Sequence, residues 1–150
     1  MSLMSCASGA STWRGYNYFL ERKAKITRRI SNTQYEGTVS GSSNVVYSVH
    51  IDLEHVRKSS CNCPHADGKR IICKHMIALF FTAFPLEAKK YNEELIAYER
   101  EAELQAEEDE CKVLSFVSGL KKAELQEILM QLLYDGPEWQ WDKFIREYIE

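Results

Sequence analysis

The alternation of apolar and polar residues in the first half of the chain predicts an antiparallel sheet. From Val45 to Leu53 every second residue is apolar, and most residues between them are polar, a pattern typical of a strand with one buried face. Shorter alternating segments and polar turns precede this strand. We expect a meander between about residues 13 and 53, with strands near 24–30, 35–39 and 45–53 and turns at 31–33 and 41–44.

The second half of the chain has apolar residues at helical spacing and no alternating pattern. Pro85 suits the first position of a new helix. Helices are expected at 75–84, from 85 to about 110, at about 120–134, and after Pro137. The last of them carries an apolar stripe that includes Trp141, Phe144 and Tyr148. We interpret this stripe mainly as packing between the last two helices, and a surface for a partner is the alternative.

Composition and charge place limits on the class of protein. The chain has 150 residues, 45% of them hydrophobic, and a net charge of −3, which favours a folded globular protein over a disordered one. No apolar stretch is long enough to span a bilayer and no signal peptide is evident, so we expect a soluble, intracellular protein, cytoplasmic if bacterial. Lys and Arg exceed Asp and Glu by six through His75, and the remainder is acidic. This asymmetry hints at an acidic partner or at attraction between the two halves.

Four potential zinc ligands are close together in the sequence. Cys61 and Cys63 form one pair, and Cys73 and His75 form the other. Pro64 favours an extended Cys63, so that both thiols of the first pair point to one side. Cys73 is expected just before the helix, with His75 in its first turn. Three thiolates and one imidazole fill a tetrahedron and leave no position for water, which indicates one structural Zn2+ ion.

Other interpretations of these residues are weaker. Buried free cysteines do not explain the polar loop that joins the two pairs, and a disulfide is disfavoured by an odd total of five cysteines. His65 lies close enough to Cys63 to replace a ligand, but we interpret it as a loop residue. His50 and His55 are interpreted as surface or core histidines.

The motif resembles the SWIM-type zinc finger, whose pattern is Cys-x-Cys, a variable spacer, and Cys-x-His. Here the spacer is residues 64–72, and the flanking residues Ser60 and Pro64 are also similar to that family. The resemblance covers about residues 24–84 and implies a zinc module that binds DNA or proteins. Together these patterns predict an α+β fold: a small antiparallel sheet with the zinc site and a short helix, followed by a helical extension. The expected domains are a mobile tail or cloning remnant at 1–11, a zinc-binding domain at 12–84 and an extension at 85–150.

No catalytic motif is visible. The sequence contains no phosphate-binding glycine loop, no His-Glu-x-x-His and no Gly-x-Ser-x-Gly, and the thiols with a nearby histidine are assigned to zinc. We therefore expect a non-catalytic binding module, most simply one that binds DNA. The alternative is a protein-interaction module that serves as a subunit or partner of a DNA-processing enzyme.

The nucleic-acid hypothesis depends on basic residues near aromatic ones. Basic side chains would neutralise phosphates, and exposed aromatic rings among Trp13, Tyr16, Tyr18 and Phe19 would stack on bases. Arg28 shares the predicted face of Ala24 and is expected to be partly buried. The candidate nucleic-acid-binding residues are Arg22, Lys23, Lys25, Arg28, Arg29, Lys69, Arg70 and Lys74.

Overall fold

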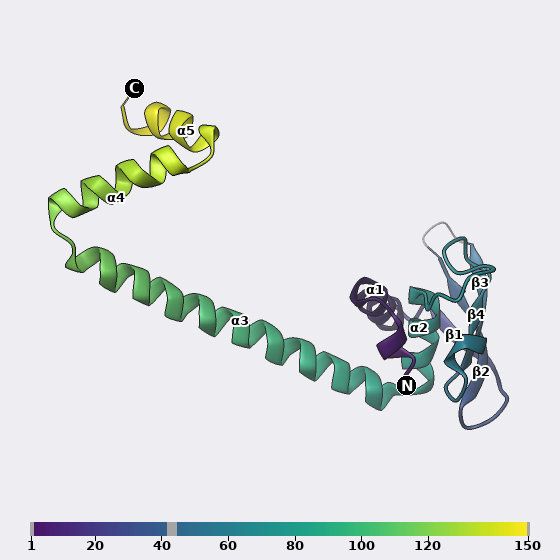
Figure 1. The fold of residues 1–150 in the computed structure, drawn as a ribbon. Helices are drawn as coiled ribbons and strands as arrows, with labels where there is room; N and C mark the ends of the chain where they lie inside the picture. Colours follow the sequence, from purple (N-terminus) through teal and green to yellow (C-terminus); the bar gives the residue numbers. More distant parts are fainter. Residues whose placement is uncertain (1, 42–44, 150) are drawn as a thin grey trace. The chain divides into compact units, whose positions relative to one another are not determined.

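A computed structural model describes residues 2–41 and 45–149, and it divides the chain into two compact units (Figure 1). The first unit extends to Ile96 and the second begins at Ala97. The elements in chain order are η1 (Met4–Cys6), α1 (Gly9–Leu20), β1 (Ala24–Arg29), β2 (Gln34–Ser40), β3 (Val46–Asp52), η2 (Val56–Lys58), β4 (Ser60–Cys61), α2 (Lys74–Ala83), α3 (Pro85–Gly119), α4 (Lys122–Asp135) and α5 (Glu138–Tyr148). The predicted α+β fold is confirmed.

The first unit contains a four-stranded antiparallel sheet in the order β1-β2-β3-β4. Its inner face carries alternate residues such as Val39, Val49 and Ile51, which are buried. Ser48, between Tyr47 and Val49, is exposed, so the alternation predicted for β3 is found from Tyr47 to Ile51. Asp52, expected on the polar face, is buried. The turn before Gln34 is also found where expected, whereas the predicted turn at 41–44 includes residues 42–44, which lie outside the described residues.

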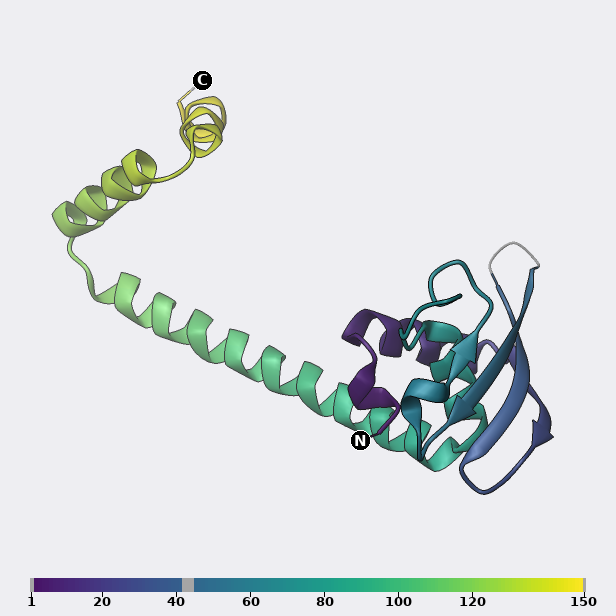
Figure 2. The same ribbon diagram turned by 45° about the vertical axis from the view of Figure 1, so that its right-hand side comes forward.

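Helix α2 forms the centre of the core. Seven of its ten residues are buried, and it packs against the inner face of the sheet, while α1 covers its other side (Figure 2). The layers are therefore α1, α2 and the sheet, in that order. At Gly37 of β2, an added Cβ would collide with the side chain of Leu79, so this glycine allows α2 to approach the sheet closely.

Residues 13–20 form part of helix α1, so the prediction that the meander starts near residue 13 is wrong. Ser8 caps this helix because its side chain accepts a hydrogen bond from the backbone N–H of Ser11. Thr12, Gly15 and Tyr18 are buried at three-residue spacing, which is helical and not strand-like. Upstream of the helix, Leu3 is only 1% exposed and belongs to the core.

Two smaller expectations also differ from the structure. Arg28 is exposed, because the β1–β2 register shifts between Ile26 and Arg28 and moves Arg28 away from the face of Ala24. Helix α3 continues past residue 110 to Gly119. Its acidic stretch does not end it, because neither Gly nor Pro occurs there and Lys112 pairs with Asp109 within the helix.

The second unit has little buried apolar surface. Leu133 of α4 is its only buried residue among those described, although the rings of Tyr134 and Trp141 stack at 5.4 Å between centroids. The helices predicted at about 120–134 and after Pro137 are confirmed as α4 and α5. Among the described helices, none is long and apolar enough to cross a membrane.

Candidate metal centre

The first pair of cysteines is held at the edge of the sheet. Cys61 lies on β4 opposite Val49 of β3. The side chain of Asn62 accepts a hydrogen bond of 2.9 Å from the backbone N–H of Ser48, and this bond fixes the chain between the two thiols. After Cys63 the chain turns, because the N–H groups of Ala66 and Asp67 both donate to the Cys63 carbonyl. The loop thus leaves both thiols on the inner side of the sheet edge, where they are buried.

The second pair lies at the start of α2, as the sequence predicts. Cys73 is the N-cap residue, with an extended backbone, and His75 lies in the first turn. The following helix is almost entirely apolar, so burial of α2 against the sheet places its first turn next to β4. Packing of the core therefore brings the two halves of the motif together.

Cys61, Cys63, Cys73 and His75 converge in one buried cluster. Their potential ligand atoms all lie within 4.8 Å of one another. The Nδ1 atom of His75 is 3.7 Å from the Sγ atom of Cys61 and 3.9 Å from that of Cys73. For a tetrahedral zinc ion with Zn–S near 2.3 Å and Zn–N near 2.0–2.1 Å, a sulfur–nitrogen separation of about 3.6 Å follows. The donor set and its spacing therefore fit zinc.

The electrostatics of the thiols also favour a cation. The pKa of Cys73 is lowered to about 4, because the Cys61 thiol donates a hydrogen bond to its sulfur and because His75 and the backbone amide of Met76 further stabilise the thiolate. The pKa of Cys61 is raised by the same hydrogen bond and by burial. A zinc ion would replace the shared proton and hold the thiols as thiolates.

His75 presents Nδ1 to the sulfurs. Its other ring nitrogen, Nε2, is buried and has no hydrogen-bond partner among the described residues. The imidazole is held by aromatic packing instead: Tyr47 of β3 stacks on it at 4.6 Å between centroids, and Tyr18 of α1 lies at 5.5 Å. Three elements, α1, α2 and β3, thus fix the orientation of this one ligand.

His65 is exposed and is not part of the four-residue cluster. It lines a cavity of about 240 Å3 beside the cluster, together with Cys63, Cys73, Arg14 and Lys74. His55 is exposed as well, and its Nδ1 atom is 3.6 Å from the Asp52 carboxylate. These positions agree with the interpretation of both as histidines outside the cluster.

The geometry defines a small Cys-x-Cys and Cys-x-His metal-binding domain. Residues 47–84 match the family of the SWIM zinc finger. This segment is therefore a SWIM zinc finger, and together with the compact Cys and His cluster it supports one structural zinc ion. Searches of curated proteins and of solved structures gave no match.

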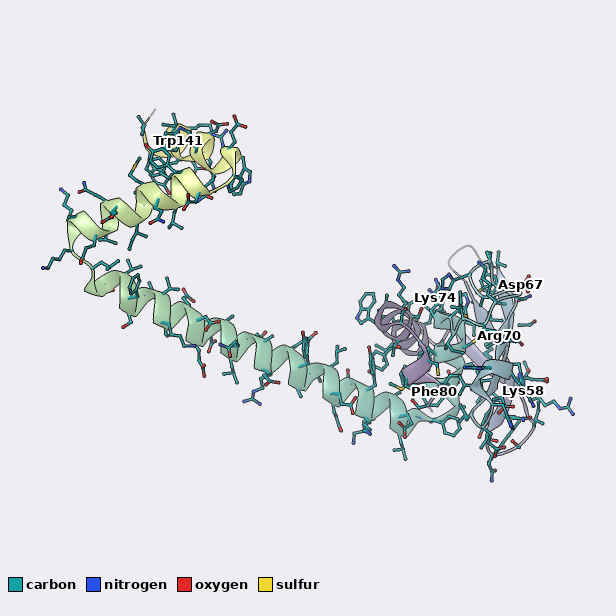
Figure 3. All side chains as sticks on the ribbon, viewed as in Figure 1. Lys58, Asp67, Arg70, Lys74, Phe80 and Trp141 are labelled. Carbon is teal, nitrogen blue, oxygen red and sulfur yellow. The ribbon has the colours of Figure 1, made fainter. Side chains whose placement is uncertain are left out.

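The candidate nucleic-acid-binding residues do not form one patch. Lys23 and Lys74 both lie over the ring of Tyr18, each 4.5 Å from its centroid, and Lys23 also pairs with Glu21. Arg22 is exposed and has a positive φ of 54°. This group lies near α1, and Figure 3 shows Lys74 there, away from Lys58 and Arg70.

The other candidates lie on the sheet and in the loop between the cysteine pairs. Lys25 and Arg28 of β1 are exposed opposite Thr38 and Glu36. Arg29 is held in the hairpin, where its guanidinium donates to Asn32 at 2.6 Å and to the Ser31 carbonyl.

Lys69 and Arg70 line an open cavity of about 480 Å3 with Arg57 and Lys58. The sequence interpretation missed Arg57 and Lys58. Their position in Arg57-Lys58-Ser59-Ser60, directly before Cys61, was the available signal.

The aromatic residues proposed to stack on bases mostly belong to the core. Tyr18 is buried, and Tyr16 and Phe19 pack against the core cluster. The centroids of Tyr16 and Phe81 are 5.6 Å apart in an edge-to-face arrangement. Trp13 is the exception, since it is 52% exposed on α1.

Proposed function

We propose that Cys61, Cys63, Cys73 and His75 hold a structural zinc ion, and that the module built around it binds nucleic acid without catalysing a reaction. The observation that carries the proposal is the basic cavity next to the metal centre, lined by Arg57, Lys58, Lys69 and Arg70. We refer to it as the basic groove.

The basic groove combines charge with small hydrogen-bonding groups. Its other lining residues include Ser59, Ser60 and Asn62, and Asp67 is its one acidic residue. Phosphate oxygens are bound in proteins by Lys and Arg together with Ser, Asn and backbone N–H groups. All four basic side chains are exposed, so they can reach a ligand that is too large to enter the protein.

The metal centre fixes the loop that lines the basic groove. Cys61 and Cys63 flank Asn62, and the loop that carries Lys69 and Arg70 begins at one ligand pair and ends at the other. When bound, zinc closes this loop by joining its two ends. Basic residues in such a short closed loop lose little freedom on binding, which favours affinity.

Binding of a labelled DNA duplex to the zinc-loaded chain tests the proposal. Lys69→Gln combined with Arg70→Gln is expected to weaken binding roughly tenfold or more and to reduce the slope of log K against log salt by about 2. Lys89→Gln combined with Lys90→Gln is the matched control, because it removes the same charge from exposed positions of α3. Equal affinities for the two double variants, with equal zinc contents, would refute the proposal.

A second candidate function is protein binding by the second unit. Many large apolar side chains of α4 and α5 are exposed, for example Leu132 at 58%, Trp139 at 64% and Tyr148 at 74%. Exposed apolar patches of this kind are typical of interaction surfaces. Deletion of residues 137–150 is expected to abolish capture of a partner but to leave DNA binding unchanged. Loss of DNA binding in this deletion would argue against separate functions for the two units.

A further inference from the structure

The outer face of the sheet continues the basic groove. Two rows of residues cross this face in register: Lys25, Thr38 and Ser48 form one row, and Arg28, Glu36, His50 and Ser60 form the other. A shallow cavity of about 260 Å3 lies over the part of these rows on β2, β3 and β4, and Thr27 is the residue of β1 that lines it. The face is thus polar from strand to strand and has a basic residue of β1 at the end of each row.

The two surfaces share residues. Ser48 and Ser60 line both the basic groove and the shallow cavity on the sheet. A continuous polar path therefore leads from Lys69 and Arg70 in the loop, across β4, β3 and β2, to β1. Three strand spacings of 4.7–4.9 Å make the sheet part of the path about 14 Å wide, which equals the rise of about four base pairs.

Among the described residues of this path, none is Trp, Tyr or Phe. The aromatic residues of β2 and β3, Tyr35 and Tyr47, are inner-face residues that contact Phe84 and His75. Trp13 belongs to α1, which α2 separates from the sheet (Figure 2). Proteins that bind single strands depend on aromatic side chains on which unpaired bases stack. Among the described residues, the two rows offer charged groups, hydroxyls and the imidazole of His50, and the exposed Val46 lies beyond them, opposite Ser40. The charged groups and hydroxyls suit a sugar-phosphate backbone.

We infer that the ligand of this module is a duplex nucleic acid, held by its backbone along a path from the basic groove across the outer face of the sheet to Lys25 and Arg28. The inference rests on the proposed nucleic-acid binding and adds the form of the ligand and its course on the protein. Glu36 lies on the path between Arg28 and His50 and opposes the binding of phosphate there.

Two variants on the sheet of the zinc-loaded chain, with one control, separate this inference from the proposed function. Lys25→Gln combined with Arg28→Gln should reduce the salt slope for duplex binding by about 2. Glu36→Gln should strengthen duplex binding several-fold, because it removes a negative charge from the path. Lys89→Gln combined with Lys90→Gln is the matched control, because it removes two charges from exposed positions of α3 outside the path, and its affinity should change little.

The probe is one 20-base-pair DNA duplex, compared with one of its strands and with an RNA duplex of the same sequence. Tighter binding of either duplex than of the single strand, together with the variant effects above, would support the inference. Equal or tighter binding of the single strand would overturn it, as would unchanged binding by the Lys25 and Arg28 double variant. If Lys69→Gln with Arg70→Gln still weakens binding in that case, the proposed function stands and only the path is wrong. Binding of none of the probes would refute both.

Discussion

The close contact between α1 and α2 at Gly15 allows a specific prediction about the stability of the metal centre. An added Cβ at Gly15 would lie 2.5 Å from the Cβ atom of Ile77 and 2.8 Å from the carbonyl oxygen of Lys74. Carbon atoms in contact are normally about 3.5–4.0 Å apart, so Gly15→Ala must push the helices apart by roughly 1 Å. Lys74 lies between two of the proposed ligands, Cys73 and His75, so this shift would also disturb the metal site.

Two opposite effects determine how much Gly15→Ala changes the free energy of unfolding. Alanine is favoured over glycine inside a helix by up to about 1 kcal/mol, whereas overpacking of a core typically costs about 1–3 kcal/mol. Here the collision involves a backbone carbonyl as well as a side chain, and a backbone atom cannot rotate away. We therefore expect Gly15→Ala to lower the free energy of unfolding by about 1–2 kcal/mol and to weaken zinc binding.

Gly9→Ala is the control for this prediction. Gly9 belongs to the same helix, and an added Cβ there would meet no atom within 4 Å, so this variant should be as stable as the parent or slightly more stable. Urea denaturation at a buffered zinc concentration gives the free energies, and competition with a chromophoric chelator gives the zinc affinities. If Gly15→Ala matched Gly9→Ala in both measurements, close packing of α1 on α2 would not support the metal centre.

Three further predictions concern the metal, a buried carboxylate and the second unit. Structural zinc contributes about 10–16 kcal/mol of apparent binding free energy, which is comparable to the whole stability of a typical domain, so chelation or Cys73→Ser should unfold the first unit; cooperative near-ultraviolet melting after complete zinc removal would contradict this. Burial raises the pKa of Asp52, but hydrogen bonds from the backbone N–H groups of His55 and Glu54 leave it below the ordinary value of 3.8. A lowered pKa means that ionised Asp52 stabilises the fold above pH 3.8 and that this contribution is lost as the pH falls further. Asp52→Asn should therefore be less stable than the parent at neutral pH, and the difference in denaturation free energy should shrink below about pH 4; a constant difference would show that the charge is not responsible. Leu133→Ala should cost about 2–3 kcal/mol and speed amide exchange in α4 and α5. A lower melting temperature or loss of zinc in the first unit would contradict the independence of the two units.

The parts of the fold that depend on local sequence pattern could be predicted. The strand at Val46–Asp52 alternates from Tyr47 onward, and the apolar run after His75 is interrupted only by Thr82 before Pro85, so both were predicted close to their observed bounds. The ligand pairs were recognisable because metal sites require particular side chains at close spacing.

Features that depend on distant contacts were missed. Helix α1 was hidden because its buried face contains Thr12 and Gly15, which carry no apolar signal, and Gly15 is favoured there only by its contact with Ile77. The basic groove was only half recognised for a similar reason. Arg57 and Lys58 are far from Lys69 in the sequence, and they share one cavity only after β4 pairs with β3.

The shortness of β4 affects how the sheet avoids aggregation. A sheet is open to strand addition from other molecules at its two edges. At one edge, β1 has a register shift and carries Lys25, Arg28 and Arg29, features that discourage intermolecular pairing. At the other edge, β4 consists of Ser60 and Cys61 alone, and the chain then turns into the ligand loop. Loss of the metal would release this loop and expose β3 as the unit unfolds, so the metal-free chain is expected to form intermolecular β-structure through β3.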